Sequence, residues 1–259
     1  MNNLLSRLPF DPTLHHAGYA FDVDNILLDQ WLESWNSTHP LLDLGCGNCR
    51  NSRKAAEQGI KVVATEICEE TLKAISGIQK NQGIDFRFMK LPDQVLFADE
   101  SFSGILCAEV FHFLDHHEII ASLWELHRIL VQGGQLFLTC ESEEYEFIQP
   151  LGFAADRARM REQFPLHLGP LVDIYELLDG MSKPLPETHP IWSYMEMFKD
   201  NAAPALMNFL NLDQLVLACK RLGFEIESAG MGRADHYPVW VHGEHDQIRL
   251  ILKKTSSLF

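Results

Sequence analysis

The sequence has no apolar run that approaches the roughly 20 residues needed to cross a bilayer. Its first ten residues also lack the charged region followed by an apolar core that is typical of a secretory signal. We therefore expect a cytoplasmic protein that does not use a membrane as its partner.

Positive charge is scarce. Lys and Arg number 21 against 36 Asp and Glu, which gives a formal net charge of -15 at pH 7. Such a surface repels phosphate backbones and anionic lipids, because like charges raise the free energy of association. The composition therefore disfavours a nucleic-acid substrate.

Cysteine pairs with metal-site spacing are also lacking. The six cysteines are scattered, and only Cys46 and Cys49 form a C-x-x-C, with no second pair to complete a tetrahedral zinc site. His242, His245 and Asp246 share one loop but follow no helix or strand ligand pattern. We predict reduced thiols and no metal.

What is present is a regular alternation of short apolar runs with helical patterns, which is typical of a parallel sheet wrapped by helices. The pattern predicts strands at 41–44, 61–65, 84–89, 104–108, 135–140, 224–229 and 247–253. It predicts helices at 24–35, 48–58, 69–80, 116–130 and 211–222, with Gly133 and Gly134 ending the fourth. The expected fold is α/β: a Rossmann-like, seven-stranded, mostly parallel sheet with helices on both faces.

Three regions follow from this pattern. Residues 1–40 form a helical segment expected to cover the ligand site, where Tyr19 closes over a bound ligand. Residues 41–142 and 208–259 form the Rossmann-like core. Residues 143–207 are interrupted by seven prolines and are predicted to be a mainly helical insertion after the fifth strand, hanging over the site as a substrate cap or forming an oligomer interface.

The stretch from Leu41 to Arg53 reads as a buried strand, a glycine turn and a helix start. Gly45 and Gly47 let a ligand approach the main chain closely, and the following helix directs free amide groups at the same place. The turn therefore predicts a site for an anionic or strongly dipolar ligand.

The second predicted strand ends at Glu66, 21 residues beyond Gly45, where a carboxylate can accept hydrogen bonds from both hydroxyls of a ribose. A dinucleotide site would want a glycine where Arg50 stands, and Asp43 would repel a pyrophosphate. An NAD-dependent oxidoreductase thus remains an alternative, and a ligand that carries an ammonium group and a sulfonium fits Asp43 better.

Several further segments carry a family resemblance: Leu91-Pro92, Asp99-Glu100-Ser101-Phe102, Glu109-Val110-Phe111-His112 and Leu130-Val131-Gln132-Gly133-Gly134. With Asp43-Leu44-Gly45-Cys46-Gly47 and Glu66, they resemble class I S-adenosylmethionine-dependent methyltransferases of the small-molecule type over residues 41–140. The stretch Gly47–Ser52 is also similar to the turn of tellurite-resistance-type methyltransferases. The resemblance implies S-adenosylmethionine as the cofactor.

The resemblance also implies roles for individual residues. Asp43 and the main chain of Gly45 to Gly47 would hold the amino and carboxylate ends of the methionine part. Glu66 would bind the ribose and Ile67 would pack on the adenine. The remaining cofactor contacts implied are Cys46, Arg50, Leu91, Asp93 for the adenine amino group, and Cys107, Ala108 and Glu109 beside the methionine part.

Methyl transfer needs a general base only if the acceptor must lose a proton. Weak candidates for that role are His112 and Glu141 at strand ends and Tyr194 in the insertion. The acidic run Glu141–Glu144 favours a cationic amine acceptor as a hypothesis. We expect a small-molecule acceptor and a monomer or homodimer, and a non-catalytic S-adenosylmethionine-binding protein stays as an alternative.

Overall fold

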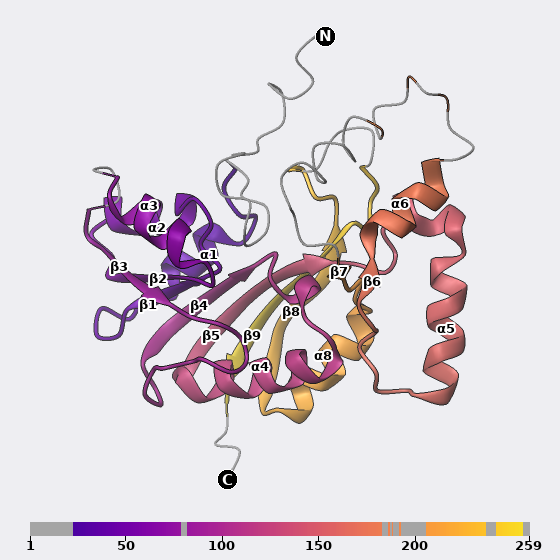
Figure 1. Ribbon diagram of the computed structural model, residues 1–259. Coiled ribbons are helices and arrows are strands. Elements are labelled where there is room, and N and C mark those ends of the chain that lie inside the picture. The colour runs from indigo at the N-terminus through magenta and orange to yellow at the C-terminus, as the bar shows by residue number, and fades with distance from the viewer. Residues whose placement is uncertain are drawn as a thin grey trace.

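The computed structural model describes residues 23–78, 82–182, 186, 188, 192, 206–236 and 242–255. Its centre is a seven-stranded sheet in the order β3-β2-β1-β4-β5-β9-β8 (Figure 1). The strands are β1 (Leu41–Leu44), β2 (Val62–Glu66), β3 (Ile84–Phe88), β4 (Phe102–Ala108), β5 (Leu130–Glu141), β8 (Phe224–Gly232) and β9 (Gln247–Lys254). The predicted α/β fold is confirmed.

Strand β9 runs antiparallel to both of its neighbours, β5 and β8, while the other pairs in the sheet are parallel. Its first residue, Gln247, therefore pairs with Glu141, the last residue of β5. This reversal puts the beginning of β9 at the edge of the sheet where the parallel strands end, which is the edge where open α/β sheets bind ligands.

Helices cover both faces of the sheet because adjacent strand residues point to opposite sides. Leu42, Ile105 and Leu136 pack in one core with α4 (His116–Ile129) and α8 (Leu212–Arg221). Their neighbours in sequence, Leu41, Leu106 and Phe137, pack in a second core with α1 (Leu28–Glu33) and α2 (Arg50–Glu57). Helix α3 (Glu69–Ser76) adds Ile75 to a small cluster beside α2.

The segment between β5 and α8 builds a separate small core. The segment begins with the 3-10 turn Glu146–Leu151. It then contains α5 (Phe153–Gln163), α6 (Ile174–Ser182) and a two-stranded sheet of β6 (Val172–Asp173) and β7 (Leu206–Met207). Phe153 meets Phe209 edge-on at 5.2 Å between ring centroids. In Figure 1, α5 and α6 stand to one side of the sheet rather than on either of its faces.

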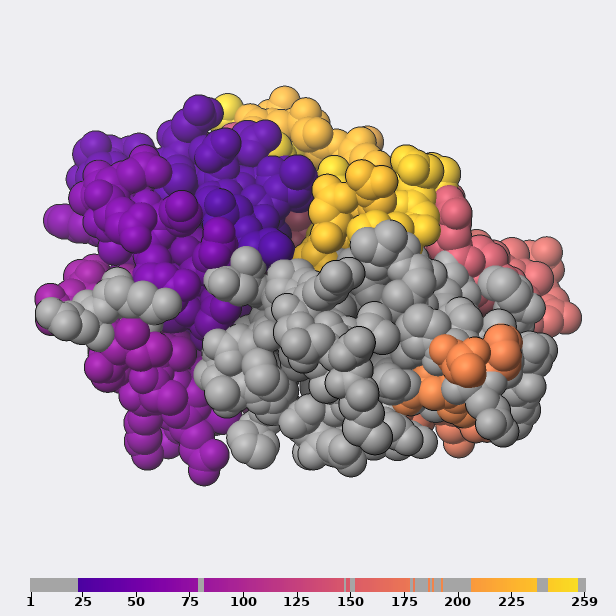
Figure 2. Space-filling view, turned by 90° about the horizontal axis from the view of Figure 1, so that it is seen from above, coloured from indigo at the N-terminus to yellow at the C-terminus, as the bar shows by residue number. Residues whose placement is uncertain are grey.

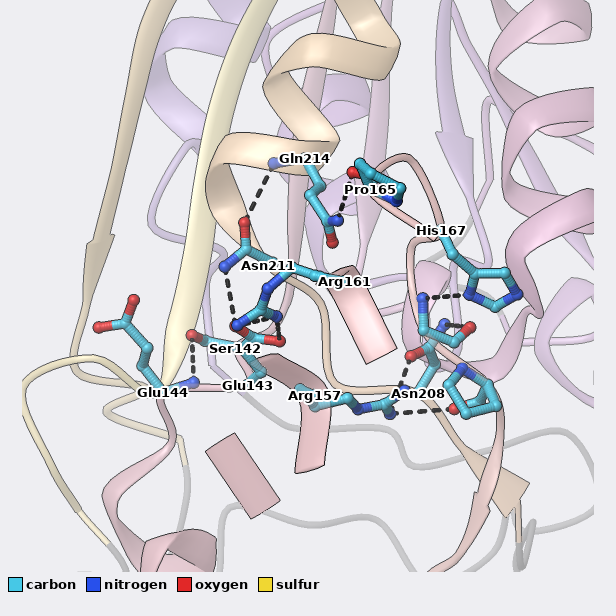
Figure 3. A network of polar contacts seen from close by, with 12 residues as sticks. Ser142, Glu143, Glu144, Arg157, Arg161, Pro165, His167, Asn208, Asn211 and Gln214 are labelled. Atoms are coloured by element: carbon cyan, nitrogen blue, oxygen red, sulfur yellow. Dashed lines mark hydrogen bonds and ion pairs between the residues drawn. The ribbon is translucent and has the colours of Figure 1, made fainter. Parts of the chain in front are cut away.

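One charged contact ties this segment to the main sheet. Glu143, just beyond β5, accepts hydrogen bonds from Arg161 of α5 at 2.5 and 2.6 Å and from Asn211 at 2.8 Å (Figure 3). Asn211 is also the N-cap of α8 and accepts from the amide of Gln214. Three elements therefore meet at a single carboxylate.

Two predicted boundaries were wrong in detail. Gly133 and Gly134 do not end a helix: α4 stops at Ile129 and the glycines lie inside β5, which starts five residues earlier than predicted. Helix α1 is shorter than predicted because the side chain of Asn25 accepts from the amide of Leu27 and holds the preceding residues in a turn.

Candidate functional site

The glycine turn after β1 is fixed by close packing. Gly45 has φ +68°, and a Cβ placed there would come within 2.6 Å of Cγ2 of Val110 in the loop after β4. The amide of Cys46 donates to the carbonyl of Thr65 at 2.9 Å. The turn is therefore held against the ends of β2 and β4, and only glycine fits its first position.

Glu66 lies where the sequence predicts it, at the end of β2 and in contact with this turn. Its carboxylate accepts hydrogen bonds from the amide of Gly47 at 3.2 Å and from the amide of Ile67 at 2.7 Å. The side chain is buried, and burial raises the pKa of its carboxyl group above the ordinary value. Two features 21 residues apart in sequence thus form one polar floor.

Asp43 lies beneath the turn. Its Oδ2 accepts from the amide of Ser52 at 3.1 Å and from the Ser52 hydroxyl at 2.5 Å, which anchors the first turn of α2. Burial raises the pKa of Asp43 to about 6. This carboxylate positions the helix, and its predicted contact with the amino group of a ligand stays a prediction.

A cleft opens beside the turn, at the carboxyl ends of β1 and β4. Figure 2 shows the indigo atoms of the first described residues beside the yellow atoms of the C-terminal part. The described residues that line it are Val23, Asp24, Asn25, Ile26, Gly45, Cys46, Gly47, Asn48, Arg50, Asn51, Ala108, Glu109, Arg233, Asp235, His236, Gln247 and Arg249. The cleft has one half built by β1 and α2 and another built by β4, β8 and β9.

The remaining predicted cofactor contacts are distributed around this cleft. Arg50 begins α2, lines the cleft and pairs with Asp24 at 2.6 Å. Ile67 is exposed just beyond Glu66, as a residue that packs on a flat base must be. Cys107 is fully buried within β4, whereas the two residues after it line the cleft.

The loop after β3 holds the other two. Leu91 is buried and Asp93 is exposed, with its carboxylate 3.9 Å from the Lys90 ammonium group. Neither is among the residues lining the cleft in the described part of the chain. Their contact with a ligand stays a prediction, and Tyr19 lies outside the described residues.

Of the three candidate bases, the described residues include two. His112 is buried in the 3-10 turn Phe111–Phe113, with its Nδ1 atom 3.6 Å from Oε2 of Glu109, and burial lowers its pKa to about 4. Glu141 is buried at the end of β5. Tyr194 lies outside the described residues.

Sequence reasoning missed the half of the cleft that β8 and β9 supply. No ligand contact was predicted within residues 233–246, yet Arg233, Asp235 and His236 line the cleft together with Gln247 and Arg249. Knowing that the last strand runs antiparallel would have predicted these residues, because the first residues of such a strand lie at the ligand-binding edge of the sheet. Apolar alternation alone does not reveal strand direction.

The family comparison bears directly on this geometry. A family model described as a methyltransferase domain matches residues 42–138, which include the turn, Glu66 and Glu109. Residues 42–138 thus match a methyltransferase domain, and solved S-adenosylmethionine-dependent methyltransferases share the fold of this chain. The predicted family resemblance is thereby confirmed.

Relatives of this methyltransferase domain share its sequence only in part. A ubiquinone biosynthesis O-methyltransferase of Xanthomonas oryzae pv. oryzae (strain PXO99A) is 30% identical over 102 residues, covering 38% of this chain and 41% of the relative. The chain thus matches less than half of the length of that relative.

Solved structures resemble the methyltransferase fold over nearly the whole chain. An S-adenosylmethionine-dependent methyltransferase from Methanosarcina mazei gives a TM-score of 0.59 at 16% identity, covering 90% of this chain and 99% of the other. A 1,6-didemethyltoxoflavin-N1-methyltransferase from Burkholderia thailandensis was solved with bound 1,6-didemethyltoxoflavin and S-adenosylhomocysteine. It gives a TM-score of 0.52 at 15% identity, covering 90% of this chain and 80% of the other. At these identities the likeness concerns the fold.

The described residues contain no group of three or more His, Cys, Asp or Glu side chains placed to hold a metal ion. None of the helices within them is long and apolar enough to cross a membrane.

Proposed function

We propose that this protein is an enzyme that transfers the methyl group of S-adenosylmethionine to a small-molecule acceptor. The observation that carries the proposal is the contact of Glu66 with the glycine turn, at 3.2 Å from the Gly47 amide. This contact places a carboxylate that can accept hydrogen bonds from ribose hydroxyls beside a turn whose first position only glycine can occupy.

The residues present fit this cofactor. The Glu66 oxygens are suited to the two ribose hydroxyls, and the Gly45–Gly47 main chain lies open to the cleft for the methionine part. Arg50, in the same cleft, is suited to the methionine carboxylate in place of Asp24, its present partner. S-adenosylmethionine supplies an activated methyl group when bound, on a sulfonium that leaves as a neutral thioether.

The chain's own contribution is then to hold donor and acceptor near attack distance in a site that excludes water. Orientation of this kind supplies roughly 7 to 11 kcal/mol of a reaction barrier. The first described residues contribute to this closure through Asn25. Its side-chain amide donates to the Thr139 hydroxyl at 3.1 Å, and its backbone amide donates to Oδ1 of Asn51 at 3.1 Å. We propose that residues 1–40 and 143–207 cover the site.

A small molecule suits this site better than a macromolecule. The net charge of -15 opposes nucleic acid, and the cleft is bounded by both the first described residues and the β8–β9 side. The name of the Xanthomonas relative, an O-methyltransferase of ubiquinone biosynthesis, also supports a small acceptor.

Transfer of label tests the proposal. The protein is incubated with methyl-tritiated S-adenosylmethionine and, separately, with the small-molecule, RNA and protein fractions of one cell extract. We expect label in the small-molecule fraction. Label in RNA or protein would contradict the acceptor class, and binding of S-adenosylhomocysteine without transfer to any fraction would indicate a binding module.

A further inference from the structure

Glu109 combines a strained backbone with a position in the cleft. It follows β4 directly and has φ +57°, a left-handed conformation that is strained for residues with a Cβ. Its amide donates to the carbonyl of Thr139 at 2.9 Å, which holds the strained residue in place. Such strain persists where the surrounding structure needs one side chain to point in one direction.

That direction is away from the glycine turn. Oε1 of Glu109 accepts a hydrogen bond from Nε2 of Gln247 at 2.6 Å. Gln247 belongs to β9, which is separated from β4 by β5 and lies on the side of β4 away from β1. Gln247 is itself oriented, because its Oε1 atom accepts from Nε of Arg249 at 2.9 Å. The carboxylate is therefore aimed into the half of the cleft opposite the proposed cofactor contacts.

Among the residues that the structure describes, the second oxygen of Glu109 has no hydrogen-bond partner. Oε2 is buried without one, as is Nδ1 of His112, and the 3.6 Å between these atoms is too long for a hydrogen bond. Burial keeps His112 neutral at pH 7 by lowering its pKa to about 4. Burial also lowers the pKa of His236, the other cleft histidine that interacts with the charge of Glu109, so no imidazolium of these two residues holds the carboxylate at pH 7. A buried acceptor without a partner among the described residues is costly unless a ligand uses it.

We propose that Glu109 is a catalytic residue whose Oε2 accepts a hydrogen bond from a hydroxyl group of the acceptor and takes its proton during methyl transfer. This inference rests on the proposed function. The hydroxyl oxygen forms the bond to the methyl carbon, the bond from that carbon to sulfur breaks with its electron pair left on sulfur, and the proton passes to Glu109 and then to solvent.

A carboxylate favours a hydroxyl over an amine acceptor. An aliphatic amine is protonated near pH 7, and a neighbouring carboxylate stabilises that form, which has no free electron pair for attack. The acidic run at 141–144 does not restore the amine hypothesis, because Glu143 is neutralised by Arg161. The acceptor class is therefore an alcohol or a phenol.

The test compares Glu109→Gln with the parent and with Glu225→Gln, an exposed acid at the start of β8, away from the cleft, that serves as the matched control. The acceptors are phenol, catechol and benzyl alcohol, set against aniline and benzylamine, with methyl-tritiated S-adenosylmethionine as donor. S-adenosylhomocysteine binding is measured on all three proteins by calorimetry.

We expect the parent to methylate hydroxyl compounds, and Glu109→Gln to lower kcat by about 100-fold or more while its S-adenosylhomocysteine affinity changes less than twofold. The control should match the parent in both. Methylation of the amines alone, no transfer to any hydroxyl compound, full activity in Glu109→Gln, or an equal loss of S-adenosylhomocysteine affinity would each overturn the assignment. A parent that does not bind S-adenosylhomocysteine would instead contradict the proposed function.

Discussion

The carboxylate of Asp43 is buried beneath the glycine turn, where it accepts hydrogen bonds from the amide and the hydroxyl of Ser52, and burial raises its pKa to about 6. Between the ordinary value of 3.8 and about 6, the folded protein therefore holds a proton that the unfolded chain has lost. The stability that this proton confers is fully present below pH 3.8 and is lost as the pH rises toward 6.

Asp43→Asn should remove that dependence, because an amide stays neutral and can still accept from Ser52. We expect the free energy of unfolding of the variant, relative to the parent, to rise between pH 4 and pH 7 by on the order of 3 kcal/mol. Urea denaturation at several pH values measures it. A difference between the two proteins that stays constant over this range would contradict the assignment.

Single residues differ in how far the sequence predicted them. Glu66 was placed correctly against the turn because strand ends in a parallel sheet share one edge. Glu109 was predicted as a cofactor contact, and no feature of the sequence predicts the positive φ of its backbone or its hydrogen bond with Gln247. Side-chain direction at a strand end depends on neighbours distant in sequence.

At the level of elements, the glycine turn depends on the approach of the loop after β4. Gly45→Ala would bring a Cβ within 2.6 Å of Val110 at φ +68°, which forces this loop away from the cleft. We expect at least a tenfold loss of S-adenosylhomocysteine affinity by calorimetry.

Gly59→Ala is the matched control for that variant. Gly59 has a similar φ of +75° but nothing within 4 Å of a Cβ, and it follows the far end of α2. It should cost about 1 kcal/mol of stability and leave the affinity unchanged. Equal losses of affinity in the two variants would show that backbone strain, rather than the contact with Val110, is responsible.

Helix and strand order followed from the alternation of apolar residues, and the bounds of β1, β2 and β3 were predicted to within one residue. The antiparallel direction of β9 was not predicted, because buried and exposed residues alternate along a strand in the same way whichever direction it runs. Gly133 and Gly134 were misread as a helix end for a related reason: a glycine pair interrupts a helix, yet an extended strand can pass through it.

Across the whole molecule, Glu143 joins the segment after β5 to the main sheet (Figure 3). Arg161→Ala would leave this buried carboxylate with Asn211 as its hydrogen-bond donor among the described side chains, and with the more distant charge of Arg157. We expect a loss of roughly 3 kcal/mol in the free energy of unfolding, since removing one partner of a buried ion pair leaves an uncompensated charge.

The double variant Glu143→Gln with Arg161→Ala separates this charge effect from lost packing. It should recover at least half of the stability, because a neutral amide needs no cation. Chemical denaturation measures both variants, and a double variant no more stable than Arg161→Ala would exclude the charge as the cause.

The central claim is that the glycine turn and Glu66 together bind the nucleoside and methionine parts of S-adenosylmethionine. Calorimetric titration with S-adenosylhomocysteine tests it on the parent, on Glu66→Ala and on Glu57→Ala, an exposed acid at the far end of α2.

We expect binding to the parent in the micromolar range, about -8 kcal/mol, no change in Glu57→Ala, and at least a tenfold loss in Glu66→Ala. Undiminished binding in Glu66→Ala, or tighter binding of NAD than of S-adenosylhomocysteine by the parent, would contradict the account.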